Sequence, residues 1–187
     1  MSHTLVLNSD FTPLSVIPIS TITWNEAIKI TYLGHADTVE LYEHWKVHSP
    51  RISLAVPSVL VSRTYIKKSQ YVRFTRRNLL IRDGFSCQYC GTHLDNNTLT
   101  IDHVIPRMRG GKTHWANVVC SCFKCNALKG SKSHMSPMRS PFKPDYYQLL
   151  HNVQKTPIII PDSKWNFYLG WDPDLVTVQI PKKNRPE

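Results

Sequence analysis

Residues 1–72 alternate short apolar runs with turn-forming residues, and this pattern predicts a small α+β module. We expect two short strands and a helix, followed by a strand with alternating polar and apolar positions; these are Leu5–Leu7, Ser15–Ile17, Trp24–Leu33 and Ala36–Tyr42. Pro50 and Pro57 interrupt the pattern that follows. This region shows no cluster of catalytic residue types, so a packing or docking role is expected for it.

Residues 73–132 change from helical to strand periodicity. An apolar run over Leu79–Ile81 predicts a helix within 73–84, with Thr75 as its cap and with Arg73, Arg76, Arg77 and Arg82 on its surface. Leu99 and Ile101 alternate with threonines and so predict a half-buried strand that leads into Asp102-His103. Gly110-Gly111 forces a loop, Val118-Val119 indicates a returning strand, and 123–130 suits a short helix.

Residues 133–187 are rich in proline and aromatic side chains. A short helix is expected over Asp145–Val153. Four aromatic side chains follow this helix: Trp165, Phe167, Tyr168 and Trp171. They suit packing in a core, docking, or stacking on nucleic-acid bases. We therefore expect three parts: a module at 1–72, a core at 73–132, and an extension at 133–187 that packs on the core.

Charge changes this picture, because it is strongly positive and unevenly distributed. The 187 residues contain 23 Lys and Arg against 13 Asp and Glu, a formal net charge of +10. Of this excess, +7 lies within 73–132. Such an excess favours a polyanionic partner, nucleic acid above all. The chain has no apolar run long enough to span a membrane and no signal-peptide pattern at its start, so a cytoplasmic protein is expected.

All five cysteines lie in the basic middle region. Cys87 and Cys90 form one Cys-x-x-Cys pair, and Cys122 and Cys125 form a second pair further along the chain. Two such pairs can complete a closed tetrahedral zinc site, with no position left for water. An odd number of cysteines without a secretion signal argues against disulfides. Cys120 has the wrong offset for a knuckle and is expected in the core.

The segment between the pairs, together with the second pair, carries a specific resemblance. It contains Asp102-His103, Pro106-Arg107, Gly110-Gly111, Asn117 and a Cys-Asn-x-x-Lys-Gly run at 125–130. In the spacing of His103, Asn117 and Asn126 it resembles the HNH endonuclease family, in the subgroup with a four-cysteine zinc site. Asn126 stands where the family motif has its last histidine. The opening at 7–16 also looks like the N-terminus of some bacterial and phage members.

This resemblance implies an α+β protein with a ββα-metal (His-Me finger) core clamped by zinc. It implies that His103 is the general base that activates water, since a histidine is partly neutral at pH 7. Asp102 and Asn126 would hold one catalytic ion, and their oxygen donors favour Mg²⁺ or Mn²⁺. Asn117 is expected to orient His103 or to hold the loop.

The partner implied is DNA, most simply double-stranded, in a bacterial or phage-infected cell and with no small-molecule cofactor. Phosphate contacts are expected from seven cations: Arg76, Arg77, Arg107, Arg109, Lys112, Lys129 and Lys132. The N-terminal module would aid substrate binding or dimerisation. Two alternatives stay open at this point: a zinc-ribbon protein that binds nucleic acid without cutting it, and a nuclease directed at RNA.

Overall fold

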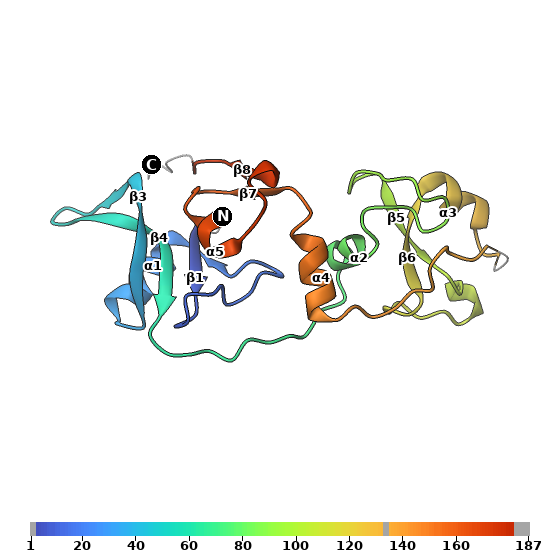
Figure 1. Ribbon diagram of the computed structural model, residues 1–187, viewed down its shortest axis with the longest axis horizontal. Coiled ribbons are helices and arrows are strands. Elements are labelled where there is room, and N and C mark those ends of the chain that lie inside the picture. The colour runs from blue at the N-terminus through green and yellow to red at the C-terminus, as the bar shows by residue number, and fades with distance from the viewer. Residues whose placement is uncertain (1–2, 133–134, 182–187) are drawn as a thin grey trace. The chain divides into compact units, whose positions relative to one another are not determined.

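The computed structural model describes residues 3–132 and 135–181 and shows a mixed α+β fold (Figure 1). The chain forms two compact units. One contains residues 3–69 and 154–181, and the other contains residues 70–132 and 135–153. Among these described residues, no helix is both long and apolar enough to cross a membrane.

The first unit is built on a four-stranded sheet in the order β2-β1-β4-β3. β1 and β4 are parallel, and the other two pairings are antiparallel. The strands and the helix that follows β2 are β1 (Thr4–Leu7), β2 (Thr21–Ile22), α1 (Trp24–Tyr32), β3 (Ala36–His48) and β4 (Ser53–Ser62). Ala27 of α1 packs in the core against Ala36 and Leu60, so the apolar side of the helix covers the sheet.

The expected helix of this unit is confirmed and its expected strands are revised. A capping box begins this helix, with the backbone N–H of Thr23 donating to the Glu26 carboxylate at 3.0 Å. Ser15–Ile17 is not a strand; Thr21–Ile22 pairs with β1 instead. β4 runs through Pro57. The β3–β4 pairing is irregular on both sides of this residue, so the N–H that proline lacks is not needed for a regular ladder of hydrogen bonds.

The C-terminal segment returns to this first unit. It contributes β7 (Ile158–Ile160), α5 (Trp165–Leu169), the 3₁₀ turn η2 (Pro173–Leu175) and β8 (Val176–Val178), with β7 and β8 paired in parallel. The buried indole of Trp165 donates to the carbonyl of Ser58 at 3.0 Å, and the Ser58 hydroxyl donates to Asp162 at 2.5 Å. The extension expected at 133–187 is therefore divided, because residues 154–181 belong to the same compact unit as the N-terminal module.

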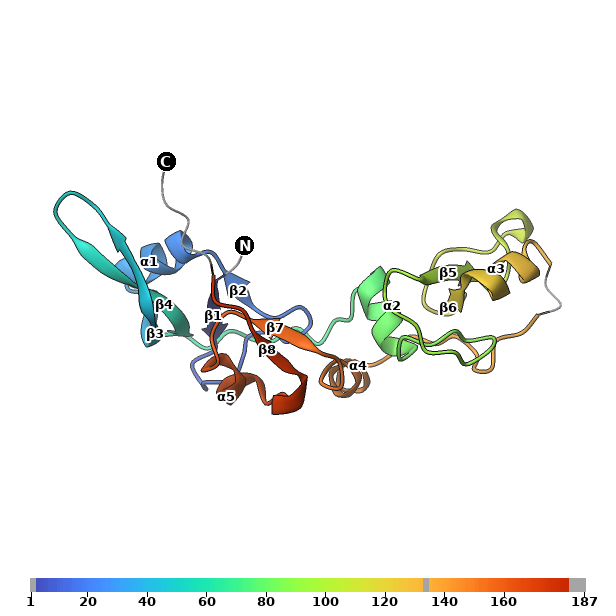
Figure 2. The same cartoon turned by 90° about the horizontal axis from the view of Figure 1, so that it is seen from above.

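The second unit contains a strand–strand–helix sequence between two outer helices. Its elements are α2 (Arg76–Arg82), β5 (Leu99–His103), the 3₁₀ turn η1 (Arg107–Arg109), β6 (Val118–Cys122), α3 (Phe123–Lys129) and α4 (Tyr146–Val153). β5 and β6 are antiparallel, with Asp102 opposite Val119 and His103 opposite Val118. α4 lies beside α2 (Figures 1 and 2), and both are helices that the sequence predicted.

Arg82 is a structural residue and not part of a solvated basic face. Its side chain is buried, with 5% of the residue exposed. The guanidinium donates to the carbonyls of Trp115 and Val118 at 2.8 and 2.7 Å, and it pairs with Asp83. An arginine can serve several carbonyls at once because its five donors form a rigid fork. Arg82 thus ties α2 to the start of β6.

Candidate metal centre and nuclease site

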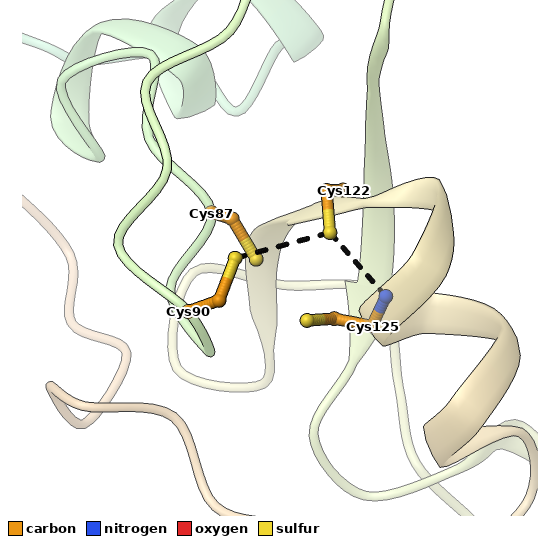
Figure 3. Close-up of side chains that lie close together, drawn as sticks. All are labelled: Cys87, Cys90, Cys122 and Cys125. Carbon is orange, nitrogen blue, oxygen red and sulfur yellow. Dashed lines mark hydrogen bonds between the residues drawn. The ribbon is translucent and has the colours of Figure 1, made fainter.

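The four paired cysteines come together, as the sequence predicted (Figure 3). Cys87 and Cys90 lie on the loop after α2, Cys122 ends β6, and Cys125 lies in the first turn of α3. Their sulfur atoms all lie within 4.8 Å of one another. Gly91 adopts a φ of 76° just after the second ligand, which a residue with a Cβ rarely does, so the first knuckle can turn sharply there.

The sulfur positions suit one tetrahedral zinc ion. With Zn–S bonds of about 2.3 Å, neighbouring sulfurs in a tetrahedron lie about 3.8 Å apart. The Sγ atoms of Cys90 and Cys122 are 3.9 Å apart. The Cys122 Sγ also accepts the backbone N–H of Cys125 at 3.3 Å, as a ligand thiolate can at the start of a helix. The four cysteines could therefore bind zinc.

The thiol acidities show why a cation suits this cluster. Hydrogen bonds from Thr92 lower the pKa of Cys90 to about 6. Burial, together with the neighbouring thiols, raises the pKa of Cys125 to about 12. A divalent cation offsets the repulsion among the thiolates, so all four can ionise.

Cys120 lies outside this cluster, as expected. It is fully buried on β6, and its backbone N–H donates to Asp83 at 2.8 Å. Burial, followed by the charge of Asp83, raises the pKa of its thiol. A neutral buried thiol behaves as a small apolar side chain, so Cys120 belongs to the core.

At the end of β5, the carboxylate of Asp102 is held by two partners. It is 6% exposed, accepts the Tyr89 hydroxyl at 2.5 Å, and forms an ion pair with Lys129 at 2.9 Å. Tyr89 lies between the first two cysteines, so the metal knuckle also positions Asp102. Burial, and then the bond to Asp102, raises the pKa of Tyr89, which keeps it a donor.

Lys129 was expected to contact phosphate, and the structure overturns that prediction. The residue is 0% exposed, and its ammonium donates to Asp102 and, at 2.7 Å, to the backbone carbonyl of His103. A buried lysine needs partners for its charge, and these groups supply them. Lys129 therefore fastens α3 to the end of β5.

His103 and Asn117 occupy the two sides of the loop between β5 and β6. The Nε2 atom of His103 lies 2.8 Å from the Thr113 hydroxyl. The Asn117 amide accepts the backbone N–H of Ile105 at 2.8 Å and donates to the carbonyls of Ile105 and Lys112. Of the two roles expected for Asn117, the contacts are those of a loop clamp.

Asn126 lies on α3 against β5. Its Nδ2 donates to the Thr100 hydroxyl at 3.0 Å. Thr100 and Asp102 are two residues apart on a strand and therefore share a face, so Asn126 and Asp102 lie at the same junction of β5 and α3. The ring of His103 instead contacts the loop, through Thr113.

The remaining cations expected at phosphates are exposed: Arg76, Arg77, Arg107, Arg109, Lys112 and Lys132. Arg76 also donates to the carbonyl of Asn96 at 2.9 Å, so part of its guanidinium holds the chain before β5. Neither Tyr89 nor Thr113 was identified from the sequence as a site residue. Tyr89 could have been suspected only from its place between Cys87 and Cys90, and Thr113 only from its place two residues after Gly111.

The geometry thus defines an α+β domain in which four cysteines are placed to bind one metal ion and an Asp-His pair ends a strand. Residues 87–139 match the family model described as HNH endonuclease, and residues 4–70 match the one described as the HNH endonuclease-associated N-terminal domain. These matches support the HNH endonuclease family, as the resemblance of the motifs indicated.

A curated relative supports this assignment over a short stretch. The CRISPR-associated endonuclease Cas9 of Actinomyces naeslundii is 32% identical over 68 residues. That stretch is 36% of this chain and 6% of the relative. The similarity thus concerns a segment of a much larger protein.

Proposed function

We propose that the chain is a metal-dependent endonuclease that hydrolyses phosphodiester bonds of double-stranded DNA. One observation carries the proposal: Asp102-His103 ends β5 at the junction with α3, which bears Asn126, inside the segment that matches the HNH endonuclease family. We assign this strand–strand–helix segment as the ββα-metal core. Its four cysteines are proposed to hold one structural zinc ion.

His103 is proposed as the general base. We assign the tautomer in which Nε2–H donates to Thr113, so that Nδ1 keeps its lone pair. That nitrogen can then accept a proton from the attacking water, whose oxygen becomes the nucleophile at phosphorus. Thr113 keeps the ring oriented, and the carbonyl of His103 is fixed by Lys129.

Asp102 and Asn126 are proposed to hold the catalytic Mg²⁺ or Mn²⁺. Their oxygens suit a hard cation, and the hydrogen bond to Thr100 uses the amide nitrogen of Asn126 rather than its oxygen. A bound ion supplies Lewis-acid stabilisation of the scissile phosphate and of its leaving oxygen. Tyr89 and Lys129 are proposed to fix the orientation of the Asp102 carboxylate from the protein side.

The six exposed cations named above are proposed to bind the DNA backbone: Arg76, Arg77, Arg107, Arg109, Lys112 and Lys132. Phosphate contacts position a duplex without selecting its sequence. The resemblance to the family implies products with 5′-phosphate and 3′-hydroxyl ends.

A substrate panel tests this function. The purified chain is incubated with supercoiled plasmid, single-stranded DNA and structured RNA, in each case with Mg²⁺ and with EDTA. We expect the plasmid to be nicked or linearised with Mg²⁺ and to stay intact with EDTA. Binding without cutting under every condition would favour a zinc-ribbon binding protein, and cutting confined to RNA would favour an RNA-directed nuclease; either result overturns the proposal.

A further inference from the structure

The β3–β4 hairpin extends past its sheet as a two-stranded ribbon (Figures 1 and 2). We call residues 46–55 the distal ribbon. β1 pairs with β4 only at Val59–Val61, so this outer part of β4 pairs with β3 alone. The pairing shifts between Leu41 and Lys46, which gives β3 extra residues at the base of the ribbon. Such a bulge bends a strand pair and changes its direction.

The distal ribbon has two chemically different faces. Lys46 lies opposite Ala55 and His48 opposite Ser53, whereas Val47 lies opposite Leu54. Because successive side chains alternate between faces, the two basic residues share one face with two small partners. The small partners leave the long basic side chains without neighbours of equal length across the ribbon. This face is therefore cationic and sterically open.

An ordered turn adds a second cation, Arg51, at the tip. The backbone N–H of Ser49 donates to the carbonyl of Ile52 at 2.8 Å, and the Ser49 hydroxyl accepts the N–H of Ile52 at 3.2 Å. Pro50 has the fixed φ that the second position of such a turn favours. Arg51 is thereby held at the tip, and it is exposed.

Charge is segregated along the hairpin. The acidic residues of β3 all precede the distal ribbon: Asp37 pairs with Arg63 at 2.6 Å, Glu40 pairs with Lys164 at 3.2 Å, and Glu43 lies 3.8 Å from the ring of His44. The distal ribbon contains no Asp or Glu. Lys46 and Arg51 form no ion pair within residues 3–132 and 135–181. Two unpaired cations on a projecting ribbon suit an anionic partner.

We infer that the distal ribbon is a second DNA-binding element, which enters the major groove of a duplex with Lys46 and Arg51 at phosphates. A two-stranded ribbon fits this groove, which is about 12 Å wide. His48 then faces the base edges from the same face as Lys46. The inference rests on the proposed function, because it takes the DNA that the nuclease unit cuts as the partner.

The test compares two double variants of the full chain for affinity to a fluorescent DNA duplex of about three helical turns. His103→Ala is included in every protein, so that the DNA stays intact. Lys46→Ala with Arg51→Ala removes the ribbon charges. Lys67→Ala with Lys155→Ala removes two charges elsewhere in the same unit and serves as the matched control. Fluorescence anisotropy gives Kd at several salt concentrations.

We expect the ribbon variant to bind at least about tenfold more weakly near 0.1 M salt, with the slope of log K against log salt less negative by about 2. The control pair should stay within about threefold of the parent protein. Equal Kd values and slopes for the two variants would overturn the inference, as would a loss of binding to vesicles with anionic lipid while DNA affinity stays unchanged. Plasmid cleavage by the chain with His103 intact separates this failure from failure of the proposed function.

Discussion

At the scale of single residues, the most consequential side chain is Lys129. It is fully buried, and it joins the carboxylate of Asp102 to the carbonyl of His103, so one ammonium holds both halves of the Asp-His pair. The sequence showed its charge but not its burial, because the partner Asp102 lies far back along the chain on another element. Pattern alone could place Asp102, His103 and Asn126 near one another, but it could not separate a buried cation from the exposed ones beside it.

Replacing Lys129 should destabilise the fold. Lys129→Met leaves the Asp102 carboxylate buried without its counter-ion, which costs about 3–5 kcal/mol. Lys132→Met changes the same residue type at a nearby exposed position and should cost less than about 0.5 kcal/mol. Urea denaturation of the zinc-loaded proteins measures both. Similar unfolding midpoints for the two variants would show that the ion pair contributes little.

At the scale of elements, the loop from β5 to β6 is set by close contacts that only glycine permits. A Cβ on Gly111 would lie 1.8 Å from the carbonyl oxygen of Ile105 and 2.9 Å from the Asn117 amide nitrogen. Gly110 has a positive φ of 83° but has open space around it. The sequence predicted a loop at this glycine pair, but it could not show at which of the two positions a side chain would clash with neighbouring atoms.

The two glycines should therefore differ when each is changed to alanine. Gly111→Ala forces the backbone of the loop apart, so we expect a loss of several kcal/mol and of cleavage. Gly110→Ala strains only its own backbone and should cost about 1–2 kcal/mol, with cleavage largely kept. Thermal melting and plasmid cleavage measure the pair. Equal effects of the two substitutions would contradict the close packing at Gly111.

The four-cysteine cluster also belongs to this scale, because it joins the loop after α2 to the start of α3. Spacing alone predicted that these four cysteines come together, since two-residue gaps confine each pair to one turn of chain. By contrast, the sequence did not predict β4, because Pro50 and Pro57 interrupt the alternation of polar and apolar residues there. The structure shows a turn at Pro50 and a shift in the β3–β4 pairing beside Pro57.

Substituting a ligand should separate the structural metal from the buried thiol. Cys90→Ser should lose bound zinc and lower the melting temperature, because metal binding supplies folding energy in small zinc domains. Cys120→Ala should keep one zinc ion per chain and lose only packing. Elemental analysis of the purified proteins decides it. Zinc retained in Cys90→Ser, or lost only in Cys120→Ala, would show that the ligand set is wrong.

At the scale of the whole molecule, positive charge is divided between the two units. Most of the excess lies in 73–132, and the distal ribbon adds cations in the first unit. The division of the chain could not be predicted from its sequence, because Trp165 meets its partner Ser58 from the other end of the chain. The aromatic residues near the C-terminus are evident in the sequence, but their spacing does not specify which part of the chain they pack against.

DNA affinity should consequently depend steeply on salt. Six cations in the nuclease unit give a slope of log K against log salt of about −5, and the two ribbon cations bring it to about −7. Anisotropy titrations of the His103→Ala protein between about 50 and 200 mM salt measure the slope. A slope near zero would contradict an interaction dominated by phosphates.

The single-turnover cleavage rate of His103→Ala decides whether the Asp-His pair at the end of β5 cuts DNA. His151, exposed on α4, supplies the control substitution His151→Ala. We expect Mg²⁺-dependent plasmid cleavage to fall at least about 100-fold in His103→Ala, with zinc content and duplex affinity unchanged, because a general base contributes about 10²–10⁴ in rate. His151→Ala should cleave at the parent rate. Cleavage by zinc-loaded His103→Ala within a few-fold of the parent would contradict the account.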